Sequence, residues 1–375
     1  MNPQKISATA HPLATLPASH TQAGFTLVEI MVGLVIGMLV SIVIVQVLST
    51  FDAQKNTTTG TADAQTNGSI ALFSMGRDIQ QAGFALLPVT DSPLECTTIT
   101  FGGTGITSIS PITIVNGDES ANLSASDSIT IRYGTSPSGG IPTRITAAPV
   151  INDVPVQTNF GCASQDVSLI INGSTCAISR VSALTGTTTV TLDNTTAAIS
   201  GANLACLGAW NTVTYAINNG NLERNGQASM SEIVNLQAQY GLSAAGLPGS
   251  DPNFNQVTQW VNAKNLADWV VAVDGASTGV DWGSNMTLAS RNRIKAIRMA
   301  VVARSPKMEP TAVTTACNSL TAPQPTGLCA WAGSDSSPAP AIDLSAGDPN
   351  WLRYRYRVFD TIIPLRNVIW SKDTL

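Results

Sequence analysis

Histidine and charge are scarce in this sequence. Only 11% of its 375 residues are charged, and its 2 histidines, His11 and His20, both lie in the first part of the chain, before Gly24. If residues 1–24 are a leader that is removed, the mature chain has no histidine. That loss excludes Ser-His-Asp and Cys-His catalysis and every metal site that depends on imidazole. The net charge of -5 gives no reason to expect a nucleic acid as a partner.

Cysteine is limited to 6 residues, and none of them belongs to a CxxC pair. This absence argues against a zinc site and against a redox-active site. An even number of cysteines in an exported chain predicts disulfides, with unpaired buried thiols as the alternative. Proximity in the sequence favours three pairs: Cys317 with Cys329, Cys162 with Cys176, and Cys96 with Cys206.

One long apolar run extends from Phe25 to Leu48, and Glu29 is its only charge. The run is long enough to span a bilayer as a helix, and longer than the apolar part of an ordinary secretory signal. A carboxylate inside a membrane is costly and usually has a partner. The nearest cation would be the α-amino group of Phe25, if the chain were cut after Gly24. Within one chain this amine would lie about 7 Å along the helix from Glu29, but between staggered chains the pair could be close.

The helical pattern continues after the apolar run, over residues 49–84. This segment has no proline, and Ile70, Phe73 and Ile79 lie near helical spacing. Glycine and threonine within residues 56–61 leave a break in the helix as an alternative. The sequence therefore predicts a helix with an apolar first half and an amphipathic second half.

From residue 85 to residue 375 the sequence predicts a strand-rich globular domain, so the expected fold class is α+β. Alternation from Val234 to Tyr240 predicts a half-buried strand. Two long irregular segments, residues 242–256 and 305–349, are expected to be functional or mobile loops. Other expected strands are residues 128–133, 167–172, 187–193, 211–217 and 294–304.

Three arginines alternate with apolar and aromatic residues near the C-terminus, in "WLRYRYRVF". Strand geometry places Arg353, Arg355 and Arg357 on one face. One interpretation is a basic stripe for nucleic acid or for an acidic neighbouring subunit. We favour an ordinary strand with a solvated face, because stacking platforms need aromatic and cationic side chains on the same surface.

The stretch "GFTLVEIMVGLVIGMLV" resembles the N-terminal signal of type IV prepilins and pseudopilins. The resemblance implies cleavage by prepilin peptidase between Gly24 and Phe25, N-methylation of Phe25, and a role for Glu29 in neutralising the N-terminus of a neighbouring subunit during assembly. Gly33 and Gly37 form a GxxxG pair that could pack against another helix. An ordinary membrane anchor is the alternative for the whole segment.

Further segments are similar to large minor pilins of the PilW family: "SMGRDIQQAGF", "IVNLQAQYGL", "IKAIRMAVVARS" and "YRYRVFDTIIPLRNVIW". This resemblance implies a minor type IV pilin that takes part in initiating pilus assembly at the tip, and so supports piliation and twitching motility. Its implied partners are prepilin peptidase, other minor pilins, the major pilin and the inner membrane. It implies a single membrane pass, a periplasmic C-terminal domain and a final place in the pilus. No enzymatic activity, cofactor, metal, nucleic acid or small-molecule substrate is expected.

Three other functions are compatible with the sequence. A minor pseudopilin of type II secretion, resembling the J subunit, would carry the same N-terminal signal. A pilus-tip adhesin would use the loops at residues 242–256 and 305–349 to bind a surface. A calcium loop around Asp274 and Asp281 is the third, but the spacing of its oxygen ligands matches no known loop, so a plain polar turn is favoured.

Overall fold

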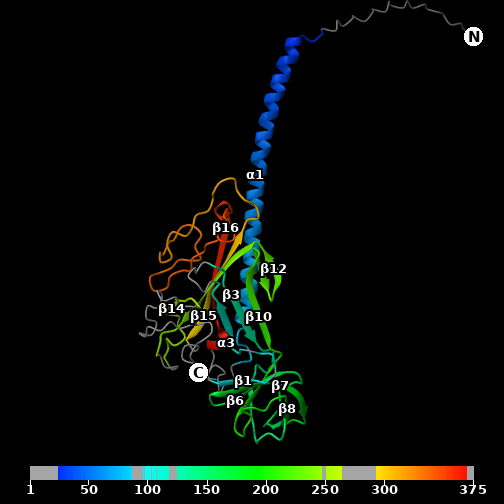
Figure 1. Ribbon diagram of the computed structural model, residues 1–375, viewed down its shortest axis with the longest axis vertical. Helices are drawn as coiled ribbons and strands as arrows, with labels where there is room; N and C mark the ends of the chain where they lie inside the picture. The colour runs from blue at the N-terminus through cyan, green and yellow to red at the C-terminus, as the bar shows by residue number, and fades with distance from the viewer. Residues whose placement is uncertain are drawn as a thin grey trace, which may run out of the picture. The chain divides into compact units, whose positions relative to one another are not determined.

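The structure is a computed structural model, and the fold that it shows is α+β. The chain divides into two compact units, Met1–Lys55 and Asn56–Leu375. A long helix, α1 (Leu27–Gln80), crosses this division, and the strands all belong to the second unit (Figure 1). The structure describes residues 24–86, 96, 98–102, 104–106, 108–117, 125–246, 251–263 and 293–369.

Helix α1 is continuous through residues 56–61, where the sequence left a break open. Its glycines at positions 60 and 68 weaken the intrinsic helix propensity, but they lie where other segments come close. A Cβ at Gly60 would meet the side chain of Ser305, and a Cβ at Gly68 would meet the ring of Phe359. A larger residue would therefore have to displace the Ser305 hydroxyl at position 60 or the Phe359 ring at position 68.

Three sheets make up most of the second unit. A four-stranded antiparallel sheet contains β14 (Gln259–Val261), β13 (Ile233–Leu242), β15 (Ile294–Arg304) and β16 (Tyr356–Pro364), in that order. A five-stranded sheet contains β12 (Gln227–Ser231), β11 (Asn221–Arg224), β10 (Asn211–Asn218), β3 (Ser128–Tyr133) and β2 (Ile112–Val115).

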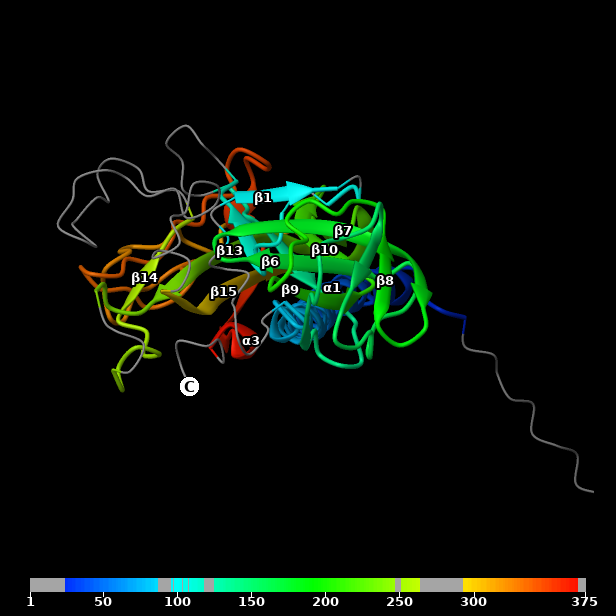
Figure 2. The ribbon, with the colours of Figure 1, turned by 90° about the horizontal axis from the view of Figure 1, so that it is seen from below.

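The third sheet has seven strands and lies at the end of the unit where β3 ends and β10 begins (Figures 1 and 2). Its path is β4 (Pro142–Arg144), β9 (Asn203–Gly208), β6 (Val167–Asn172), β7 (Thr175–Thr185), β8 (Thr189–Leu192) and β5 (Asp153–Pro155). Strand β1 (Thr98–Phe101) joins it parallel to β7. The short helices η3 (Trp351–Arg353) and α3 (Arg366–Ile369) complete the described elements.

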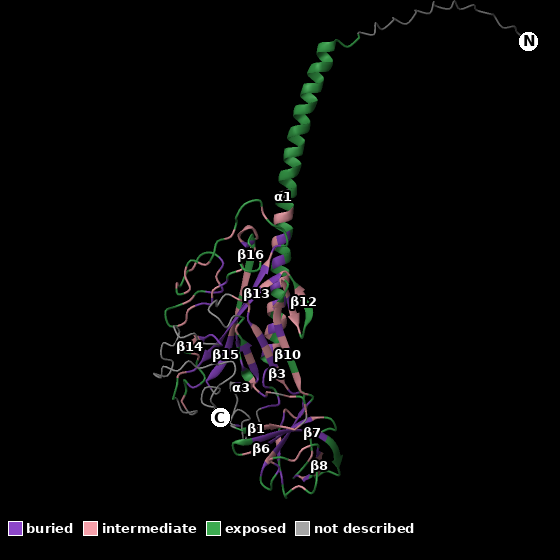
Figure 3. Cartoon of the chain, in the orientation of Figure 1, coloured by how far each residue is buried: buried purple, intermediate pink, exposed green. Residues whose placement is uncertain are grey.

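The main core forms where the second half of α1 meets the four-stranded and five-stranded sheets. Four α1 residues at helical spacing are buried there: Ala64, Ala71, Met75 and Ile79. They pack with inward-facing residues of β3, β10, β13 and β15 in one cluster. Figure 3 shows the change along α1, from exposed residues throughout its first half to a mixture of buried, intermediate and exposed residues in its second.

Strand β13 differs from the half-buried strand that its alternation predicts, because both of its faces are buried. Asn235, Gln237 and Gln239 point away from α1, yet at most 2% of each residue is exposed. The segment between β15 and η3 covers this face, and the carbonyl of Pro338 accepts a hydrogen bond of 3.0 Å from Gln239 Nε2. Much of the expected loop at residues 305–349 is therefore a layer of the core.

Two of the three expected disulfide pairs are wrong. The structure pairs Cys96 with Cys176 and Cys162 with Cys206, while Cys317 pairs with Cys329 as expected. The parallel pairing of β1 with β7 places Ile99 beside Cys176, so the chain just before β1 reaches that cysteine. Proximity in the sequence fails here because sheet order, and not chain order, decides which cysteines meet.

Candidate assembly site

The candidate site lies at the start of α1, where Thr26 and Glu29 form a closed local arrangement. The backbone N–H of Thr26 donates to Glu29 Oε2 at 2.9 Å, and its hydroxyl donates to the same oxygen at 3.0 Å. In return, the N–H of Glu29 donates to Thr26 Oγ1 at 3.2 Å. This is a capping box, in which the first and fourth residues satisfy each other's backbone donors at a helix N-terminus.

The capping box gives Glu29 a structural role that the sequence analysis missed. The signal was present, because Thr-x-x-Glu before an apolar run is the usual sequence pattern of this cap. The carboxylate is thus partnered within its own chain, and it is also exposed and adjacent to Phe25. Pairing with a neighbouring subunit's N-terminus and capping of its own helix are therefore two separate explanations for the presence of Glu29 in the apolar run.

The other predicted residues of this region lie open at the surface. Phe25 is 84% exposed, and a Cβ added at Gly24 would meet no atom within 4 Å. The same is true of Gly33 and Gly37, which lie one helical turn apart on one face of α1. All side chains from residue 27 to residue 48 are exposed, so this half of α1 presents a mostly apolar surface to its surroundings, with Glu29 as its one charged side chain.

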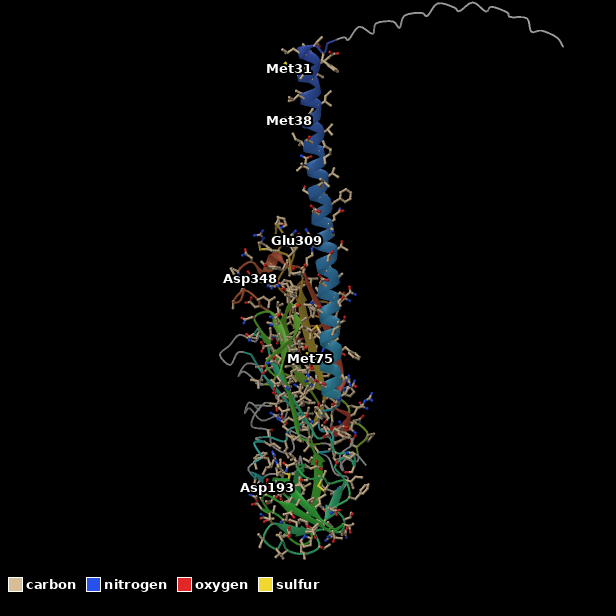
Figure 4. The ribbon with its side chains drawn as sticks, turned by 90° about the vertical axis from the view of Figure 1, so that its right-hand side faces the viewer. Met31, Met38, Met75, Asp193, Glu309 and Asp348 are labelled. Carbon is tan, nitrogen blue, oxygen red and sulfur yellow. A yellow bond between two sulfur atoms is a disulfide. The ribbon has the colours of Figure 1, made fainter. Side chains whose placement is uncertain are left out.

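Among the described residues, α1 is the one helix long and apolar enough to cross a membrane. Met31 and Met38 project from its bare first half, whereas Met75 lies in the packed second half (Figure 4). An exposed apolar surface of this extent requires lipid or other helices around it. The cysteines belong to the second unit, so they take no part in this site.

A second set of contacts fixes the end of α1 to the five-stranded sheet. Asp78 Oδ2 accepts hydrogen bonds from Tyr215 Oη at 2.8 Å and from Arg224 Nε at 3.0 Å. Burial raises the pKa of Tyr215, so its hydroxyl remains protonated and can donate to the carboxylate. Sequence reasoning did not find this group, because its members are far apart in the chain.

Two family models match the chain. The model of the prokaryotic N-terminal methylation motif matches residues 19–45, and the model of type IV pilus-assembly protein W matches residues 208–367. The chain is a PilW-family type IV pilin. The resemblance that the sequence indicated is thereby confirmed. No curated protein and no solved structure gives a significant match.

Family membership assigns a role to the exposed half of α1. The PilW-family match spans β10 to β16 and much of the core around α1, and the methylation motif spans the capping box and both glycines of the GxxxG pair. Pilin domains are structural rather than enzymatic, and pilins assemble with other pilus components after processing by prepilin peptidase. The apolar helix and the motif together fit membrane anchoring. The seven-stranded sheet lies almost wholly outside both matches. Asp274 and Asp281, considered as a calcium loop, lie outside the described residues.

Proposed function

We propose that this chain is a minor type IV pilin, made with a leader of residues 1–24 and cut by prepilin peptidase between Gly24 and Phe25. Residues 25–48 would hold it in the inner membrane, with residues 49–84 continuing the helix and residues 85–375 in the periplasm. With other minor pilins it would form the tip complex that primes assembly of the major pilin, and so support piliation and twitching motility.

One observation carries the proposal. The exposed apolar helix of this PilW-family chain begins with a helix cap that includes the carboxylate of Glu29. The cap directly follows Phe25, the residue that processing would make the N-terminus. After cleavage the new amine of Phe25 and the carboxylate of Glu29 are the only charges in residues 25–48. Helix packing would supply most of the cohesion of the fibre, and this charge pair would set the register between subunits.

The direct test is mass analysis of the N-terminus, on protein extracted from membranes with and without the peptidase. A mature chain that begins with N-methylated Phe25 is expected with the peptidase, and an uncut chain is expected without it. A mature N-terminus at any other residue would refute the processing that we propose.

Two variants at one position separate the roles of Glu29. Glu29→Gln keeps the capping box, since glutamine serves at this position of the motif, but it removes the charge. Glu29→Ala removes both. If the charge pairs with a partner's amine, both variants should be cleaved normally and both should lower the amount of subunit in sheared pili about tenfold or more. Thr26→Ala, which removes only the cap, should have a smaller effect. Normal incorporation of Glu29→Gln would assign the acid to capping alone.

A minor pseudopilin of type II secretion remains the alternative within the same machinery. It shares the processing and the membrane helix, so the two functions differ only in what is lost on deletion. Loss of surface pili and twitching supports the pilus role, and loss of exoprotein secretion with intact pili supports the pseudopilin role.

A role in surface attachment is favoured by an observation in the seven-stranded sheet. Ile151 occupies the turn before β5 with a φ of 56° and is 88% exposed, and Phe160 is 83% exposed. A β-branched residue in the left-handed region is strained, and such strain is often retained for function. If these side chains bind a surface, Ile151→Asn and Phe160→Ser should each reduce attachment while pilus number stays normal. Unchanged attachment in both variants would remove this candidate.

A further inference from the structure

A groove of about 280 Å³ lies between the second half of α1 and strand β16, within the unit Asn56–Leu375. Thr61 and Ala64 of α1 form one wall. Thr314, Arg355 and Arg357 are among the residues of the opposite side. Nothing in the proposed processing or membrane insertion uses this groove.

Positive charge predominates around the groove, although the whole chain has a net charge of -5. Arg355 Nε donates to Glu309 Oε1 at 2.8 Å, and Arg353 Nε donates to the backbone carbonyl of Glu309, also at 2.8 Å. Lys307 adds a further cation near the same carboxylate, and the hydrogen bond from Arg355 lowers the pKa of Glu309, so the acid is ionised. The Glu309 carboxylate thus has Arg355 and Lys307 as cationic neighbours, while Arg357 lines the groove apart from it.

Arg357 is the cation that this local network leaves over. Its residue is exposed, and its guanidinium makes no ion pair or hydrogen bond with any residue that the structure describes. The threonine hydroxyls of the groove cannot compete for an anion. Thr61 Oγ1 donates to the carbonyl of Thr57 at 2.8 Å, and Thr314 Oγ1 donates to the carbonyl of Tyr354 at 2.6 Å. Hydrogen bonds from the groove to a ligand would therefore come from Arg355 and Arg357.

We propose that this groove binds a carboxylate side chain of a neighbouring pilus subunit, held in a two-pronged contact by Arg357. The proposal rests on the function proposed above, since it takes the partner to be another subunit of the fibre. Guanidinium and carboxylate match in geometry and charge, which makes the bidentate pair one of the stronger polar contacts in proteins.

The position of Arg357 allows a second chain to approach. Strand β16 is the last strand of its sheet, so its outer edge has no strand partner among the described residues. An edge strand is open to a neighbouring polypeptide. An anionic membrane fits less well, because a flat surface would meet the net negative charge of the chain, whereas one side chain inside the groove meets only the local cations.

The test measures binding of a fluorescent hexaglutamate peptide to the full chain in neutral detergent micelles, with hexaglutamine as the uncharged control peptide. Wild-type protein should bind hexaglutamate and not hexaglutamine. Arg357→Glu should weaken binding about tenfold or more, and Arg357→Lys should lie between the two, because lysine keeps the charge but loses the fork. Arg144→Glu is the matched control, since Arg144 is exposed on β4 and its substitution changes the net charge by the same amount as Arg357→Glu.

Several results would overturn the proposal. They are failure of the wild type to bind hexaglutamate, equal weakening by Arg144→Glu, and inorganic phosphate that competes as well as the peptide, which would indicate a phosphate or lipid-headgroup site. The thermal unfolding midpoint of Arg357→Glu should equal that of the wild type. Equal midpoints show that weaker binding by the variant is not caused by unfolding.

A cellular measurement separates this proposal from the function on which it rests. Arg357→Glu should be processed and membrane-inserted normally but enter sheared pili less well, and an acid-to-lysine change in another pilus subunit should restore it. Normal incorporation of Arg357→Glu would refute the groove while leaving the pilin function intact. Normal piliation in a strain that lacks this protein would refute the proposed role in pilus assembly, whatever result the peptide assay gives.

Discussion

The two halves of α1 have opposite compositions and opposite surroundings. The first half is apolar and fully exposed, and the second half is rich in Thr, Gln, Asp and Asn yet has a buried face of Ala64, Ala71, Met75 and Ile79. Hydrophobicity alone would assign the core to the wrong half. The comparison shows that burial within the chain follows the spacing of apolar residues, while continuous apolarity marks a surface intended for lipid or other helices.

Methionine occurs in both halves and gives the largest expected contrast. Met75→Ala removes a fully buried side chain and should lower the free energy of unfolding by about 2–5 kcal/mol. Met38→Ala, in the exposed half, should leave it unchanged, because no packing is lost. Denaturant titration of the detergent-solubilised chain, followed by tryptophan fluorescence, measures both. Equal effects would mean that the two halves do not differ in packing.

The core that covers the second half of α1 should also be sensitive to pH, through the buried Asp127 beside strand β13. Its carboxylate accepts hydrogen bonds from the N–H of Ala238 at 2.8 Å and of Gly117 at 3.3 Å, but burial raises its pKa from 3.8 to about 7. A raised pKa in the folded state means that stability is complete below the unfolded pKa and falls as pH rises through the folded pKa.

We therefore expect the free energy of unfolding to decrease by up to roughly 4 kcal/mol between pH 4 and pH 7. Denaturation midpoints across this range measure the decrease. In Asp127→Asn the slope should flatten whatever its absolute stability, because the side chain no longer titrates. A slope that survives the substitution would assign the pH dependence to another group.

Glycine is a second residue type that both halves of α1 contain. Gly68→Leu would force a side chain into the ring of Phe359, so it should cost about 1–3 kcal/mol of stability. Gly33→Leu meets no atom within 4 Å and should leave unfolding unchanged while weakening contact with other membrane helices. Thermal unfolding and incorporation into pili report the two effects separately. Loss of stability in both variants would contradict the contrast.

The smallest expected effect concerns the polar contact at the end of the covered half. Asp78→Ala removes the acceptor of Tyr215 and Arg224, and it should cost about 1 kcal/mol, because Arg224 is partly exposed and solvent screens the pair. Asp63→Ala is the control, since Asp63 is exposed on the same helix. A difference in unfolding midpoint between these variants measures the contact, and identical midpoints would show that it contributes nothing.

Local patterns made much of the site predictable. The apolar run, the acid in it and the glycines of the GxxxG pair all act within one or two helical turns, so their spacing in the sequence is their spacing in space. The capping box was equally local, since its Thr26-x-x-Glu29 pattern is visible in the sequence. The continuity of α1 was harder, because the glycines that weaken the helix lie against Ser305 and Phe359, which are far along the chain.

Contacts between distant segments could not be predicted in the same way. The pairing of Cys96 with Cys176 depends on the parallel placement of β1 beside β7, and the burial of Gln239 depends on the segment that carries Pro338. Neither arrangement leaves a periodic trace in the sequence. The stripe of arginines illustrates the same limit, since only the structure shows that Arg353 and Arg355 contact Glu309 while Arg357 faces a groove.

The sequence by itself determined the signal for processing, the membrane-length helix, the α+β class and the resemblance to the PilW family, because each follows from residues that are neighbours along the chain. The tertiary structure alone decided which cysteines meet, which polar residues are buried and which arginine of the C-terminal stripe has no partner among the described residues. The physical reason is that sheet order and the covering of a sheet are set by the packing of the whole domain, where one residue can gain or lose a partner without any change in its own local pattern.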